Sequence, residues 1–350
     1  MTLLVRKALA PGWRVPLFLS LMKRTLTAGM AAGVLASALL PATAFAAAAD
    51  DAFPRQSIKL VLPFPPGSGT DGTARVMGNE IAAAIGQPVV IENKAGAAGS
   101  IATTHVAKAA PDGYTLLASG VGNIVVLPHT TRMQINPLTD LEHITMTGEG
   151  DQILSIHPDV PAKTFEEFVA LSKTQPGAMF YGSAGIGGNM HLYLEQLRLL
   201  SGARIDAVQY KGGNELMPDL LANRVQMSLN APPVVEGYIQ EGKLRPLLIF
   251  GRERNPKMKQ VPTVREAGMP ELEAASNWFG LHAPKGTPQA IVRRLNAAVV
   301  EALQRPAVQL GLKTMSVRAV GDSPEHFRAR LDKDYRAFGE VAKAAHMLAK

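Results

Sequence analysis

Cysteine is absent from the 350-residue sequence, and this absence excludes several properties at once. Without a cysteine the chain has no lipoprotein attachment site, no disulfide and no thiol chemistry. A chain of this length can do without disulfides, because its core is large enough to stabilise it. The enzyme motifs G-x-S-x-G and H-E-x-x-H and the P-loop are also missing. The eight histidines show no metal-ligand spacing, so the sequence predicts no metal site and no cofactor.

Acidic residues are missing from the first 46 positions, which instead carry five basic ones: Arg6, Lys7, Arg14, Lys23 and Arg24. A small apolar run follows from Ala28 to Leu40, and Ala44-Phe45-Ala46 closes the segment. This order is typical of a secretory signal peptide. The run has about thirteen residues, whereas a membrane span needs ~20. We therefore expect cleavage after Ala46 and release of the mature chain into the periplasm.

The basic character of the sequence comes mostly from that leader. The whole chain has 36 basic and 29 acidic residues and a formal charge of +7. Without residues 1–46, the balance is 31 basic to 29 acidic residues, or +2. Nucleic-acid binding thereby loses its compositional support. The hydrophobic content of 47% excludes intrinsic disorder, and the length suggests two domains.

Short apolar runs alternate with amphipathic segments from Ser57 onward, which indicates an α/β architecture. Strands are predicted at 58–62, 88–92, 114–118, 151–156, 179–181, 207–210, 225–229 and 244–250. Helices are predicted at 73–85, 100–109, 164–175, 189–200, 215–222 and 288–304, and from 323 toward the C-terminus.

A glycine-rich loop, residues 67–72, fits the pattern G-x-G-x-x-G between a predicted strand and a predicted helix. With Glu92 at the end of the next strand, Gly67, Gly69 and Gly72 could form a dinucleotide-binding fingerprint. The preceding Pro63-Phe64-Pro65-Pro66 argues against that fingerprint. Its three prolines force an extended path where a dinucleotide loop turns sharply.

A second glycine-rich loop, residues 181–188, repeats the strand–loop–helix arrangement some hundred residues later. In each loop, glycines let the backbone approach a ligand, hydroxyls stand beside them, and a helix N-terminus follows. Two such loops on two lobes could hold one small anion between them. The alternative is that both are ordinary glycine turns.

The sequence resembles the Bug-type extracytoplasmic solute receptors, which are the substrate-binding proteins of tripartite tricarboxylate transporters. The resemblance begins at Ile58–Gly67 with Thr70-Asp71 and runs through nearly the whole mature chain. Its further segments are 86–90, 92–94, 107–117, 181–183, 191–192, 210–212, 242–245, 261–263, 266–268 and 283–288. This likeness is far more specific than a single G-x-G-x-x-G.

The resemblance implies a periplasmic-binding-protein fold of type II, with two α/β lobes joined by hinge strands around a ligand cleft. We expect one lobe to comprise residues 47–153 and 252–350 and the other residues 154–251. The family's ligands are mostly small carboxylates, and its partners are the membrane subunits of the transporter. A monomer is expected.

The two ligand loops of the family correspond here to Pro63–Asp71 and Ser183–Gly188. Where an Asp often follows a strand of the second lobe, this chain has Asn230, which weakly favours a ligand without a buried amino group. Asp71 is expected to cap or orient the first helix. Trp278 and His191 are assigned to packing or capping more readily than to the ligand. The predicted ligand-binding residues are Phe64, Pro65, Gly67, Ser68, Gly69, Thr70, Asp71, Asn123, Ser183, Ala184, Gly187, Tyr210, Lys211 and Asn230.

Three functions remain open at this point. The leading hypothesis is a periplasmic receptor, not an enzyme, that delivers a small carboxylate to a membrane transporter. The second is an NAD-dependent dehydrogenase, against which export argues, because nicotinamide cofactors are cytoplasmic. The third is a receptor that reports ligand occupancy to a membrane sensor protein.

Overall fold

The computed structural model describes residues 53–175, 177–210 and 213–349, which belong to one compact unit. The expected signal peptide with its cleavage site lies outside the described residues, and so does Lys211. Among the helices that the structure describes, none combines the length and the apolar character needed to cross a membrane.

The first of two sheets has six strands in the order β11-β4-β10-β3-β1-β2. β1 is parallel to both β2 and β3, whereas β10 is antiparallel to β3 and β4, and β11 is antiparallel to β4. The strands are β1 (Ile58–Leu62), β2 (Val89–Asn93), β3 (Thr115–Gly120), β4 (Leu141–Gly150), β10 (Asn277–Pro284) and β11 (Val317–Ala319).

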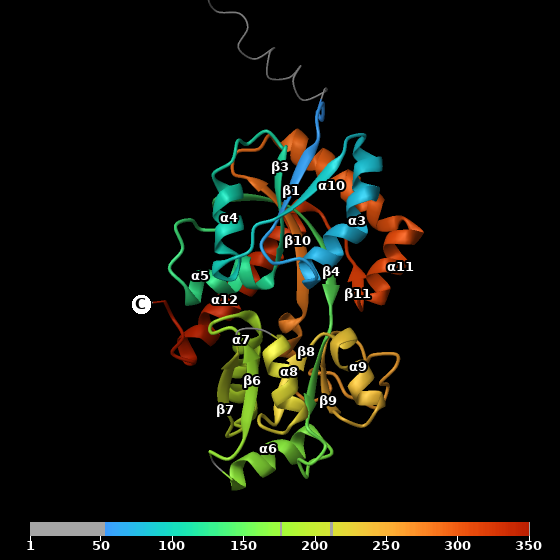
Figure 1. The fold of residues 1–350 in the computed structure, drawn as a ribbon. Coiled ribbons are helices and arrows are strands. Elements are labelled where there is room, and N and C mark those ends of the chain that lie inside the picture. Colours follow the sequence, from blue (N-terminus) through green and yellow to red (C-terminus); the bar gives the residue numbers. More distant parts are fainter. Residues whose placement is uncertain (1–52, 176, 211–212, 350) are drawn as a thin grey trace, which may run out of the picture. The chain divides into compact units, whose positions relative to one another are not determined.

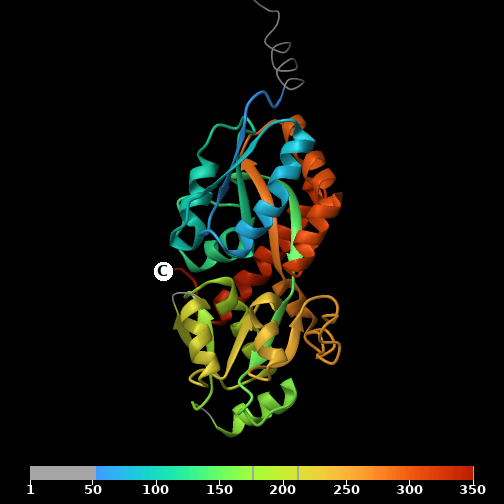
Figure 2. The ribbon, with the colours of Figure 1, turned by 45° about the vertical axis from the view of Figure 1, so that its right-hand side comes forward.

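Helices cover both faces of this sheet, so its central strands are apolar on both sides (Figures 1 and 2). Leu60 and Leu62 of β1 pack in one cluster with residues of α3, α10 and α11. Val61, between them, packs in another cluster with residues of α4 and α12. The helices are α3 (Gly69–Ile85), α4 (Ser100–Ala107), α10 (Gln289–Gln304), α11 (Pro306–Thr314) and α12 (Pro324–Ala344).

The second sheet has five strands in the order β7-β6-β8-β5-β9. β6 is parallel to β7 and β8, and β5 is antiparallel to β8 and β9. Its strands are β5 (Gln152–Ile156), β6 (Phe180–Ala184), β7 (Asp206–Tyr210), β8 (Met227–Asn230) and β9 (Arg245–Phe250). One face packs against α6 (Phe165–Thr174) and α7 (Asn189–Ser201), the other against α8 (Gly213–Leu221) and α9 (Pro232–Gln240).

The chain passes from one sheet to the other at two places. Asp151 alone separates β4 from β5, and after β9 the chain returns to the first sheet at β10. The two-lobed α/β architecture is therefore as expected. The lobe boundaries at residues 153/154 and 251/252 stay a prediction, because residues 53–350 form one compact unit that the contacts within it do not divide.

The predicted elements are found within three residues of their expected ends, with one exception. Helix α3 begins at Gly69 and not at Thr73, because Ser68 caps it: the Ser68 hydroxyl accepts the Asp71 N–H at 3.3 Å. The sequence prediction was also wrong in leaving strands β4, β10 and β11 and helices α9 and α11 unassigned. Asn123, expected in a loop, lies in the π-helix η2 (Gly122–Val126).

Candidate functional site

The first glycine loop joins β1 to α3 and lies at the carboxyl end of β1. Pro65, Gly67 and Gly69 are exposed, Phe64 and Ser68 are half-buried, and Thr70 and Asp71 are buried. Gly67 has a φ of +83°, a conformation that L side chains rarely adopt. This glycine therefore allows the chain to turn from the proline-rich arm into the first turn of α3.

Asp71 organises this loop. Its carboxylate accepts the Gly67 N–H at 3.0 Å, the Arg75 guanidinium at 2.9 Å and the Asn93 amide at 3.0 Å. Asn93, at the end of β2, also donates to the Phe64 carbonyl at 2.9 Å. The hydrogen bond from Arg75, with help from Gly67 and Asn93, lowers the pKa of Asp71 to about 2 although burial opposes this. The expectation that Asp71 orients the first helix agrees with these contacts.

We expect Asp71→Asn to lower the free energy of unfolding by about 1–3 kcal/mol, because its amide nitrogen would face donors where a carboxylate oxygen now accepts. Urea unfolding at neutral pH measures this loss. The pKa of Asp71 is below its ordinary value of 3.8 in the folded state, so its stabilisation is present above pH 3.8 and fades toward pH 2.

Asp159→Asn is the matched control, because the Asp159 side chain is 77% exposed. This control should change stability by less than about 0.5 kcal/mol. Equal losses in the two variants would show that Asp71 does not hold the loop.

The second glycine loop joins β6 to α7 and is anchored at both ends. The Gly185 N–H donates to the Tyr210 carbonyl at 2.9 Å, and the Gly187 N–H donates to His191 Nδ1 at 3.2 Å. The Thr130 hydroxyl of α5 (Leu127–Thr130) donates to the Gly187 carbonyl at 2.9 Å. His191 therefore fixes the loop from the first turn of α7, which agrees with the capping role expected for it.

Several buried polar atoms near this loop have no hydrogen-bond partner among the described residues. They are the Ser183 hydroxyl, the Asn230 amide nitrogen and both amide atoms of Gln209. Ser183 is fully buried and Asn230 is 6% exposed. β6, β7 and β8 run parallel, so these residues all lie near the carboxyl edge of the second sheet, the edge where α/β proteins bind ligands. Unpaired buried polar groups are rare and call for an explanation.

The segment from Gly120 to Asn123 lies beside both glycine loops. A methyl group on Gly120 would be 3.6 Å from the Thr70 hydroxyl of the first loop, and one on Gly122 would be 3.8 Å from Asn189, just after the second. The Asn123 amide accepts the Gly120 N–H at 3.0 Å and donates to Thr103 at 2.9 Å. Asn123 is fully buried and uses its amide to shape this segment, the turn role that its position in the sequence also allowed.

Other residues proposed from the sequence are engaged elsewhere. The Tyr210 hydroxyl donates to Asp219 at 2.9 Å, so the phenol faces α8. Trp278 is fully buried and donates to Asp334 at 2.9 Å, which makes it a core residue. Ala184 ends β6, and its backbone continues the pairing with β7. Gln209, whose buried amide has no hydrogen-bond partner among the described residues, was not among the residues predicted from the sequence, because a single glutamine in a predicted strand gives no signal of its own.

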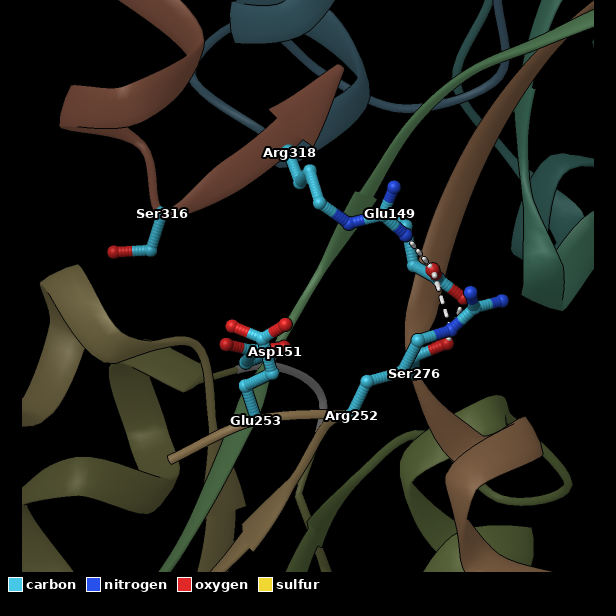
Figure 3. Close-up of a pocket in the computed structure, with 7 residues that line it drawn as sticks. All are labelled: Glu149, Asp151, Arg252, Glu253, Ser276, Ser316 and Arg318. Atoms are coloured by element: carbon cyan, nitrogen blue, oxygen red, sulfur yellow. Dashed lines mark hydrogen bonds and ion pairs between the residues drawn. The ribbon is translucent and has the colours of Figure 1, made fainter. Parts of the chain in front are cut away.

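A separate hollow of about 300 Å³ lies where the chain passes between the sheets (Figure 3). Its lining comprises Glu149, Asp151, Arg252, Glu253, Ser276, Ser316 and Arg318 and includes no residue of either glycine loop. Burial, with repulsion from Glu149, raises the pKa of Asp151 to about 6. A perturbed carboxyl in a hollow can mark a functional site.

We assign this hollow to the joint between the sheets and not to the ligand. Arg318 and Arg252 both reach Glu149, at the end of β4, from two other segments (Figure 3). These ion pairs therefore link β4 to β11 and to the segment that follows β9. Among the described residues, no three His, Asp or Glu side chains are grouped so as to hold a metal ion.

The arrangement does not favour a dinucleotide site. Helix α3 already begins at Gly69, and Glu92, the expected ribose-binding acid, forms ion pairs with Lys59 at 3.1 Å and Lys94 at 2.7 Å. Two α/β sheets, each with a glycine-rich loop at the carboxyl end of a parallel strand, instead define a two-lobed binding protein (Figure 1).

Comparisons with known proteins specify this class. The family model described as "Tripartite tricarboxylate transporter family receptor" matches residues 73–337. Protein BugT of Bordetella pertussis is 34% identical over 295 residues, which cover 84% of this chain and 90% of BugT. An R. palustris protein solved with adipate has 30% identity and a TM-score of 0.75, covering 85% of this chain and 100% of that one. MatC from Rhodopseudomonas palustris with bound malate has 29% identity and a TM-score of 0.70, covering 83% and 99%.

The chain belongs to the tripartite tricarboxylate transporter receptor family. Members of this family are periplasmic solute-binding receptors, so this chain is a receptor and not an enzyme. The resemblance recognised in the sequence is confirmed.

Proposed function

We propose that this receptor captures a small carboxylate between its two glycine loops and delivers it to the membrane subunits of a tripartite transporter. The observation that carries the proposal is that one segment, Gly120–Asn123, lies beside Thr70 of the first loop and beside Asn189, the residue that follows the second loop. In each loop, the N–H groups of a helix N-terminus can meet an anion. Relatives solved with adipate and with malate support the same ligand class.

A thermal-shift screen of the mature protein with carboxylates, amino acids, amines and sugars tests the ligand class. A ligand at 100 times its dissociation constant adds about 2.7 kcal/mol to the free energy of unfolding. We expect carboxylates to raise the melting temperature. Shifts obtained only with amines or neutral sugars would contradict the proposal.

Thr70→Val tests the first loop within the site. The Thr70 side chain is 4% exposed and lies beside Gly120, and valine keeps its shape while removing the hydroxyl. We expect carboxylate affinity to fall about tenfold or more, since a lost hydrogen bond to a charged group is worth about 1.5–3 kcal/mol. Titration calorimetry measures the change.

Thr104→Val, the same substitution on α4 and outside both loops, is the control and should bind as the unaltered protein does. Equal affinity in the two variants would remove Thr70 from the site.

We further propose that the mature chain starts at Ala47 and acts as a monomer. N-terminal sequencing of the exported protein and its sedimentation behaviour test these two points.

A further inference from the structure

We propose that Gln209 and Ser183 form a subsite for a neutral hydrogen-bonding group of the ligand, a hydroxyl or an amide, beside its carboxylate. This inference rests on the proposed function and specifies which carboxylates the receptor prefers. It starts from two adjacent side chains whose polar atoms are buried without partners.

The two residues face the same way. Ser183 of β6 and Gln209 of β7 are partners in the register of two parallel strands, so their side chains lie on one face of the sheet. Tyr181, two residues before Ser183, lies on that face too and donates to Glu195 of α7 at 2.6 Å. The pair is therefore on the face that α7 covers, one residue inside the carboxyl end of the strands.

The first turn of α7 begins just beyond this pair. Its N-cap is Gly188, which has no side chain to satisfy the N–H groups of the turn. A ligand carboxylate is favoured at such a helix N-terminus. A second polar group of the same ligand would then lie against Ser183 and Gln209, at the start of the loop in which Gly185 and Gly187 have positive φ angles.

The chemistry of the pair favours a group that both donates and accepts. The glutamine amide offers one acceptor and two donor hydrogens, and the serine hydroxyl both donates and accepts. A hydroxyl or amide can pair with both functions, whereas a carboxylate has no hydrogen to donate and would leave the glutamine carbonyl oxygen unpaired. Glu195 and Arg198 of α7 pair with each other at 2.7 Å, so they bring no net charge to this face.

An unpartnered buried amide lowers the stability of the free protein, which gives the first arm of the test. We expect Gln209→Leu to melt at the same temperature as the unaltered protein or higher. Gln226→Leu is the matched control, because the Gln226 amide accepts the Phe180 N–H at 2.8 Å and donates to the Asn223 carbonyl at 2.9 Å. That variant should melt lower.

The second arm measures affinity for succinate, for malate, which adds a hydroxyl, and for succinamate, which has an amide in place of one carboxylate. The unaltered protein and Gln226→Leu should bind malate or succinamate at least tenfold more tightly than succinate, because a site built to hydrogen-bond a group rejects the analogue lacking it. In Gln209→Leu this ratio should fall toward one, and Ser183→Ala should lower it less.

Several results would overturn the inference. It fails if the unaltered protein binds succinate, malate and succinamate with equal affinity, or if Gln209→Leu keeps the affinity ratio of the unaltered protein. It also fails if Gln209→Leu loses all three ligands alike, or if this variant melts at a temperature as low as Gln226→Leu does. If other carboxylates bind but these ratios fail, the proposed function stands and only the subsite is wrong. If no carboxylate binds at all, the proposed function fails and the subsite fails with it.

Discussion

Arg330→Met is expected to lower the free energy of unfolding by about 3–5 kcal/mol, the cost of leaving buried charges without their partner. Arg330 of α12 donates to Asp334 at 2.8 Å and to Glu149 at 3.1 Å. Asp334 is fully buried and Glu149 is 6% exposed. Methionine keeps the apolar stem of arginine but removes the charge that both carboxylates share.

This cluster holds three elements together. Glu149 is on β4, Asp334 on α12, and Trp278 of β10 donates to Asp334 at 2.9 Å. Ser276 donates to Glu149 at 2.6 Å. Burial alone would raise the pKa of Glu149, but Ser276 and the charges of Arg330 and Arg252 keep it below its usual value. Glu149 therefore stays ionised and needs its cations.

Urea unfolding of Arg330→Met measures this effect, with Arg305→Met as the matched control. Arg305 and Glu301 form an ion pair one helical turn apart at 2.6 Å, but their side chains are 47% and 55% exposed. Exposed pairs of this kind contribute between 0 and about 1 kcal/mol. A loss in Arg330→Met no larger than in the control would show that the buried cluster is not needed for stability.

The second large effect is a loss of stability in acid, caused by two buried histidines between β3, β4 and β10. The Ser119 hydroxyl lies 2.6 Å from His282 Nε2, the two Nδ1 atoms of His282 and His143 are 2.9 Å apart, and His143 Nε2 is 3.4 Å from the Leu138 carbonyl. One consistent assignment has Ser119 donating to His282, His282 to His143, and His143 to Leu138, with both rings neutral. Protonation of His143 would place its Nδ1–H against the Nδ1–H of His282, and protonation of His282 would place its Nε2–H against the hydroxyl hydrogen of Ser119.

Burial, with the nearby charge of Arg328, lowers the pKa of His143 from 6.5 to about 4, and burial holds the pKa of His282 well below 6.5. The unfolded chain therefore takes up protons near pH 6.5 while the folded chain does not. The contribution of the neutral histidines to the free energy of unfolding is therefore complete above pH 6.5 and is lost as the pH falls to 4. For His143 this loss is about 3 kcal/mol.

Chemical unfolding at pH 7 and pH 4.5 checks this prediction in the unaltered protein and in His143→Gln, which cannot titrate. The variant should lose less stability between the two pH values. Buried carboxyls with raised pKa values, such as Asp151 and Asp322, act in the opposite sense but equally in both proteins. His105→Gln, at an exposed position, should follow the unaltered protein. Parallel losses in all three proteins would exclude the histidine pair as the cause.

The sequence predicted the elements whose apolar pattern is local. β1 was placed with its observed bounds because every residue of Ile58–Leu62 except Lys59 is apolar, as suits a strand covered on both faces. β4 and β10 were missed because polar residues interrupt them. His143, Thr145 and His282 are buried in these strands, and their polar atoms are satisfied by partners far away in the sequence.

In the candidate site, too, the sequence predicted the local features of the glycine loops but not their contacts with distant residues. Their positions, their glycines and the helices behind them follow from the order of residues. The sequence could not show that Asp71 ties the first loop to Asn93 of β2, or that Thr130 holds the second loop from α5. The orphaned amide of Gln209 was equally hidden, since a polar residue is orphaned only by what surrounds it.

By itself, the sequence determined the family, the α/β class and the two loops, because these depend on local propensity and on motifs read in order. Tertiary structure alone decided which polar groups are paired, which stay unpaired, and where charges are buried. The physical reason is that burial and hydrogen bonding depend on neighbours brought together by folding, such as Glu149 and Arg330, which are 181 positions apart.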